Sequence, residues 1–111
     1  MKVVLEPDLA KVVAFRKLVE DVNPILEGEI GTASDRVTAT WGVRIDDHGR
    51  PLIRLSVSDW TGQTQREFHP EDLTPPEQAR RRFNRMWGDH LQSALLRQFE
   101  KLEAIGAESE G

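Results

Sequence analysis

The side chains that could do chemistry in this sequence are few, and their spacing predicts no metal site. No two of the histidines, His48, His69 and His90, stand four residues apart, the spacing that puts two ligands on one helix face. A site would need Asp46, Asp47 and His48 to meet a distant histidine, whereas ordinary turn chemistry accounts for all three. The absence of cysteine excludes disulfides, thiolate catalysis and cysteine-ligated metals. We therefore expect no metal and no other cofactor.

Asp59 is the most informative carboxylate, because it directly precedes the turn residues Trp60-Thr61-Gly62. We predict that it accepts hydrogen bonds from the backbone amides of this turn. The Asp-Thr-Gly motif of aspartic proteases is not present, since Trp60 intervenes. An enzyme would need Asp59 to meet Asp47 and His48 in one pocket. We expect no catalytic residues and no enzymatic activity.

Arginines are concentrated near the start of the last predicted helix, where positive charge opposes the helix dipole. The cluster comprises Arg80, Arg81, Arg82 and Arg85. It is interpreted either as a solvated face paired with neighbouring acids or as an anion contact, with Arg81, Arg82, Arg85 and Arg54 as the candidate residues. The formal net charge of −4 disfavours nucleic-acid binding through bulk electrostatics.

The elements that must position these residues begin with a predicted antiparallel sheet of three strands between Val37 and Phe68. Apolar and polar residues alternate along residues 37–45 and 52–57, as in strands with one buried face. The predicted buried face is Trp41, Val43, Ile45, Ile53, Leu55, Val57 and Phe68. The predicted polar face is Thr38, Thr40, Arg44, Arg54, Ser56 and Arg66. The polar third strand, residues 64–68, is expected at an edge.

Whether the buried residues have odd or even numbers predicts whether each hairpin loop holds an odd or an even number of residues. Odd positions must lie opposite odd positions in the first hairpin, so its loop should hold three or five residues around Gly49. Phe68 has an even number, so the second loop should hold an even number of residues. We predict a two-residue turn at Thr61-Gly62 that sets Phe68 beside Leu55.

The first helix is predicted to start at Pro7 and Asp8 and to carry one apolar stripe. That stripe is Val12, Phe15, Val19 and Val22. The helix should end at Asn23-Pro24, because proline disfavours the α conformation in the residue before it. Residues 25–36 are then expected to form a loop. Residues 3–5 could either join the sheet or pack against it.

The last helix is predicted to open with a capping box, with Thr74 as N-cap and Glu77 reaching back to it. It should run to about Ala104. Its C-terminal half carries more apolar surface than a short helix can cover, so it is expected to pack either on the first helix or on another subunit. The residues in question are Leu95, Leu96, Phe99 and Leu102.

Together these elements predict an α+β fold: a helix, a three-stranded antiparallel β-meander and a long helix, with both helices packed on one face of the sheet. With 111 residues, 38% of them hydrophobic, the chain should form one domain over residues 1–106 and a disordered tail over 107–111. The element order resembles that of the double-stranded RNA-binding domain. That family carries a lysine-rich motif where this chain has Thr74-Pro75-Pro76-Glu77-Gln78, so no membership is inferred.

For function, the sequence favours a small non-enzymatic interaction or structural module. We expect a homodimer formed through the surplus apolar residues of the last helix, with Trp60 as a further contact and a protein partner as another option. The alternative is a nucleic-acid or anion-binding domain that uses the arginine cluster and the polar sheet face. No transmembrane span or signal peptide is apparent, so we expect a cytoplasmic protein without membrane contact.

Overall fold

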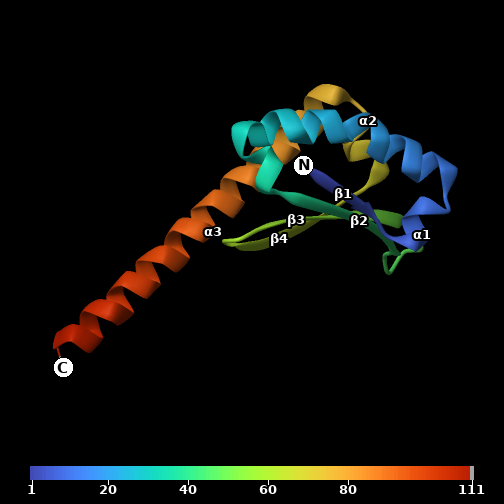
Figure 1. Ribbon diagram of the computed structural model, residues 1–111. Helices are drawn as coiled ribbons and strands as arrows, with labels where there is room; N and C mark the ends of the chain where they lie inside the picture. The colour runs from blue at the N-terminus through green and yellow to red at the C-terminus, as the bar shows by residue number, and fades with distance from the viewer. Residues whose placement is uncertain (111) are drawn as a thin grey trace.

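The computed structural model describes the backbone of residues 1–110 and the side chains of residues 1–103. It is an α+β structure in which helices cover one face of a four-stranded sheet (Figure 1). The elements in chain order are β1 (Lys2–Leu5), α1 (Pro7–Ala10), α2 (Val13–Ile30), the 3-10 helix η1 (Gly31–Arg36), β2 (Thr38–Ile45), β3 (Pro51–Asp59), β4 (Gly62–Phe68), the 3-10 helix η2 (Pro70–Asp72) and α3 (Pro76–Glu110).

The sheet is mixed, with strand order β1-β2-β3-β4, so the prediction of three antiparallel strands is only partly right. Strands β2, β3 and β4 do form the antiparallel meander, and β4 lies at one edge as expected. Strand β1 adds to the other edge in parallel with β2, pairing Val3 with Ala39 and Leu5 with Trp41. The helices α1 and α2 provide the long crossover that a parallel neighbour requires.

The β2–β3 hairpin confirms the parity argument. Trp41 lies opposite Leu55, and Ile45 lies opposite Pro51, which leaves the five-residue loop 46–50. Within this loop Gly49 has a positive φ of 75°, a conformation that residues with a Cβ rarely adopt.

The β3–β4 hairpin has an even loop of two residues, as predicted, but the loop is Trp60-Thr61 and not Thr61-Gly62. Gly62 begins β4 with a φ of 147°. The pairing is therefore shifted by two residues, and Phe68 lies opposite Ile53 instead of beside Leu55. Because the shift is even, Phe68 keeps its place on the buried face.

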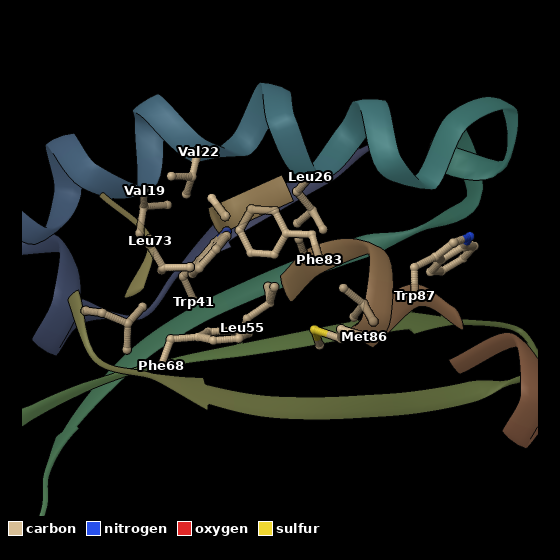
Figure 2. Packing of buried hydrophobic residues seen from close by; sticks show 14 of the residues in the cluster. Val19, Val22, Leu26, Trp41, Leu55, Phe68, Leu73, Phe83, Met86 and Trp87 are labelled. Carbon is tan, nitrogen blue, oxygen red and sulfur yellow. The ribbon is translucent and has the colours of Figure 1, made fainter. Parts of the chain in front are cut away.

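The core lies between this face and the two long helices (Figure 2). Phe83 of α3 sits between two aromatic side chains of the sheet in edge-to-face contacts, 6.2 Å from Trp41 and 6.1 Å from Phe68 between ring centroids. Burial along β2 falls from Trp41, which is fully buried, through Val43 to Ile45, which is 61% exposed. The assignment of Ile45 to the buried face was wrong, because the helices cover the middle of the β2–β3 hairpin and leave its loop end open.

The first helix differs from the prediction at both ends. It is broken after α1, and α2 then continues through Pro24 to Ile30, so residues 25–36 are helical and do not form the predicted loop. The physical reason is a buried stripe at three- and four-residue steps, namely Val19, Val22, Leu26 and Ile30. Burying Leu26 and Ile30 outweighs the local cost of a proline inside the helix. Asn23, beside that proline, accepts a 2.9 Å hydrogen bond from the Trp41 indole nitrogen.

The start of α3 also differs, because Thr74 does not act as its N-cap. The helix begins at Pro76, and the Thr74 hydroxyl donates 3.0 Å to the carbonyl oxygen of Pro70, which closes η2 instead. Glu77 pairs with Arg80 at 3.4 Å and does not reach back to Thr74.

The far end of α3 is longer than predicted, since the helix continues past Ala104 to Glu110. Its second half projects from the body as an arm (Figure 1), and the molecule measures 58 × 33 × 23 Å. The side chains of the predicted tail, residues 107–111, lie outside the described part of the chain, so its disorder stays a prediction. Over the described residues, no helix has both the length and the apolar character that crossing a bilayer demands.

The proline in α2 gives a direct test of this account of the helix. Pro24 is exposed, so its ring contributes little packing, yet it removes a backbone donor from the helix interior. Pro24→Ala should therefore stabilise the protein by about 1–3 kcal/mol in urea unfolding. A destabilised variant would show that the proline itself shapes α2 against the core.

Candidate functional site

The sequence placed one candidate surface on the C-terminal half of α3, and the structure leaves that surface uncovered. Its five large apolar side chains are each more than half exposed: Leu91, Leu95, Leu96, Phe99 and Leu102. The option that these residues pack on the first helix is therefore wrong. At about 100° per residue, Leu91, Leu95, Phe99 and Leu102 fall on one side of the helix, whereas Leu96 lies about 100° away from Leu95. We call the first four residues the arm stripe.

The arm stripe continues the side of α3 that faces α2 in the body. Asn84, seven residues before Leu91, lies on that side, and its amide donates 3.1 Å to Glu29 near the C-terminal end of α2. Because α2 ends at Ile30, α3 extends beyond the helix that covers this side. The apolar residues of the stripe thus begin where the cover from α2 stops.

A different side of the same segment is attached to the β3–β4 hairpin. The His90 ring is fully buried beneath the hairpin, and the guanidinium group of Arg97 lies so close to Gly62 that a Cβ there would collide with it. Both residues are more than 100° from Leu95 around the helix. The contact fixes the direction in which the arm leaves the body while its opposite side stays open.

Trp60 lies at the tip of the β3–β4 hairpin and is 76% exposed. Its role as a contact residue stays a prediction.

The arginine cluster lines a hollow of about 400 Å³ between β4 and the first half of α3. The lining residues are Arg66, Glu67, Phe68, Gln78, Arg81, Arg82, Arg85 and Met86. Three of the four candidate anion contacts, Arg81, Arg82 and Arg85, are therefore brought together. A second hollow of about 470 Å³, lined by Glu29, Arg80, Arg81, Asn84 and Arg85, adjoins the same arginines.

Arg54 does not join this cluster. It lies on the opposite face of the sheet, where it forms a 2.6 Å ion pair with Glu6 across Gly42. The fourth arginine that lines the hollow is Arg66 instead. Its register partner is Leu55, so Arg66 points to the helix-bearing side, and its assignment to the polar face was wrong.

Several of the charges around the first hollow are already paired. Arg66 contacts Asp89 at 3.2 Å, and Arg82 contacts Asp72 at 3.3 Å. Glu67 is paired with Arg44 of β2, across the intervening strand β3, and the hydrogen bond from Arg44 lowers the pKa of Glu67 below its ordinary value. Among the side chains that the structure describes, neither Arg81 nor Arg85 has a carboxylate within ion-pairing distance.

A buried polar network that was not predicted from the sequence surrounds His90. Its Nδ1 atom lies 2.8 Å from the Thr64 hydroxyl, and its Nε2 atom lies 3.2 Å from a carboxylate oxygen of Asp59. The ring also stacks on Trp87, with centroids 5.1 Å apart. A neutral imidazole satisfies both contacts, donating from Nε2 to Asp59 and accepting at Nδ1 from Thr64. The signal was present, since His90 is four residues after Met86 and seven after Phe83, the spacing of the buried side of α3.

Asp59 has the role that the sequence predicted for it, with this addition from α3. It accepts a 2.9 Å hydrogen bond from the amide of Thr61 and a second bond from the Thr61 hydroxyl. Burial alone would raise the pKa of Asp59, but the two bonds from Thr61 and the neighbouring His90 outweigh it, so the pKa lies below its usual value. Asp59 and Thr64 line neither of the hollows described above. The network therefore joins the hairpin to α3.

The residues of the enzyme hypothesis do not converge. Asp47 and His48 lie in the loop 46–50 at the start of β3, whereas Asp59 lies at its other end. In that loop Asp46 accepts hydrogen bonds from the amides of His48 and Arg50, each at 2.9 Å. No group of three or more histidine and carboxylate side chains that could hold a metal ion occurs among the described residues.

The pKa of Asp59 leads to a prediction about acid stability. A carboxyl whose pKa is lowered by folding stabilises the folded state above its unfolded pKa of about 3.9, and this contribution is lost as the pH falls through the folded value. Asp59→Asn should therefore lower the free energy of unfolding at pH 7 by about 1–3 kcal/mol. The gap to the unsubstituted chain should narrow below about pH 4, as measured by urea unfolding at pH 7, 5 and 3. Asp47→Asn, in an exposed loop, is the matched control and should show little change; a gap that grows in acid would contradict the assignment.

Comparison with protein-family models, with curated proteins and with solved structures finds no match to this chain. The case for a function therefore comes from two features of α3, the uncovered arm stripe and the arginine-lined hollow.

Proposed function

We infer that the chain is a non-enzymatic interaction module that acts as a homodimer, formed by side-by-side packing of two α3 arms. The observation that supports this most is the arm stripe itself, a row of exposed leucine and phenylalanine side chains on a helix that extends beyond the body (Figure 1). Contiguous exposed apolar surface of this kind is typical of interaction sites.

A partner packed on the arm would stabilise its helical state. Beyond Arg97 it extends as a single helix away from the sheet (Figure 1). Helices of fewer than about 12–15 residues are marginal in water even for favourable sequences, and most helix stability in proteins comes from burying an apolar face. A partner helix packed on the arm stripe supplies that burial.

A second copy of the chain fits this requirement. The stripe has steps of four, four and three residues, which is the pattern of one helix packed along another. The charged side chains of Arg97, Glu100 and Lys101 lie about 100° or more from Leu102, whereas Glu103, four residues after Phe99, lies at the border of the stripe. A two-fold axis lets one stripe serve as the other's complement, and both are buried at once. Each large side chain fully buried contributes roughly 1.5–3 kcal/mol before the cost of association is subtracted.

The nucleic-acid alternative has weaker support. It required the arginine cluster and the polar sheet face to act as one surface, but Arg54 and the cluster lie on opposite faces of the sheet.

We also propose that the homodimer is cytoplasmic. This location rests on the sequence expectations alone.

Light scattering at two protein concentrations tests the dimer. The unsubstituted chain should have the mass of a dimer at the higher concentration. Phe99→Glu should be monomeric at both, because a symmetric contact receives two buried charges from one substitution. Its helical circular dichroism should also fall, since a free arm is marginal.

The matched control is Ser93→Glu, which adds the same charge to the arm about 200° from Leu91. It should remain a dimer. A monomeric unsubstituted chain at both concentrations would overturn the proposal, and dissociation by Ser93→Glu as strong as by Phe99→Glu would place the contact elsewhere.

A further inference from the structure

The arginine-lined hollow is independent of the arm stripe. It lies beside the first half of α3, at residues 78–86, whereas the stripe begins at Leu91. The buried side chains of Phe68 and Met86 form its apolar base, and Gln78 places a side-chain amide at its wall. Its remaining walls are Glu67 and arginine side chains from two elements, β4 and α3.

The hollow has an excess of positive charge. Four guanidinium groups line it, and two of them, those of Arg66 and Arg82, are paired with Asp89 and Asp72. Glu67 is engaged by Arg44, which lies outside the lining. Arg81 and Arg85 therefore supply two positive charges with no carboxylate partner among the described side chains. In addition, the Nε atom of Arg82 is buried and has no hydrogen-bond partner.

This arrangement carries an electrostatic cost that a bound anion would relieve. Arg81 and Arg85 are four residues apart on the helix, a spacing at which like charges destabilise it. An anion between them would remove this cost, and the guanidinium fork is the donor geometry that matches phosphate and carboxylate oxygens.

We propose that this hollow binds a small organic phosphate monoester, with the phosphate held by Arg81 and Arg85 and the organic part set against Phe68 and Met86. The two unpaired charges match a phosphate monoester, which carries about −1.5 to −2 at neutral pH, better than a single carboxylate. The volume of about 400 Å³ falls in the range of small-molecule sites and leaves room for an organic group beside the phosphate. The Gln78 amide is a further donor for a phosphate oxygen.

Isothermal titration with phenyl phosphate, in a phosphate-free buffer of low ionic strength, tests the site. Phenyl phosphate should bind more tightly than inorganic phosphate, which lacks a group for the apolar base. It should also bind more tightly than benzoate, which carries one charge. The double variant Arg81→Gln/Arg85→Gln should bind phenyl phosphate about tenfold more weakly or worse.

The matched control is Arg16→Gln/Arg36→Gln, which makes the same change in net charge at exposed positions outside the hollow. It should bind like the unsubstituted chain, and equal melting temperatures would show that both double variants are folded. Phe99→Glu should also bind normally, so the failure of the dimer and the failure of this site can be told apart.

Three results would overturn the proposal. They are the absence of phenyl phosphate binding, equal weakening in both double variants, and a short single-stranded RNA that binds more tightly than phenyl phosphate and displaces it. The last result would assign the hollow to nucleic acid instead of a small molecule.

Discussion

The packing of Phe83 between Trp41 and Phe68 holds α3 against the sheet, and the two candidate functional surfaces depend on that contact. It sets α3 beside β4, which opens the arginine-lined hollow between them. Farther along the helix, His90 and Arg97 attach α3 to the β3–β4 hairpin, so the arm leaves the body in a fixed direction. The arm stripe is exposed because α3 is longer than the elements that cover it.

The parts of the fold that the sequence predicted well are those with few discrete solutions. Strand parity allowed only odd loops around Gly49, and the loop 46–50 has five residues. The sequence predicted poorly those parts of the fold in which a local backbone preference competes with burial against residues distant in the chain. Pro24 is a strong local stop signal, but burial of Leu26 and Ile30 against the sheet overrides it. Thr74 has the residue type of an N-cap, and it closes η2 instead.

The candidate surfaces likewise include features that the sequence predicted well and features that it predicted poorly. The surplus of apolar residues on α3 could be counted in the sequence, but whether Phe99 packs inside the chain depends on where α2 ends. The clustering of Arg81, Arg82 and Arg85 was visible, whereas Arg66 was assigned to the polar face by its charge. Its position two residues before Phe68 already places it on the helix side. His90 was considered only as a ligand, although helical spacing placed it in the core.

Hydrogen exchange of the arm amides at two protein concentrations tests most directly whether the arm is held by a second copy. Residues 98–102 lie beyond the contact of Arg97 with the hairpin and are uncovered on the stripe side, so their protection should come from the dimer. We predict slow exchange of these amides at high concentration and fast exchange on dilution, with the amides of α2 and β3 unchanged. Fast exchange at both concentrations, or protection that does not depend on concentration, would contradict the account.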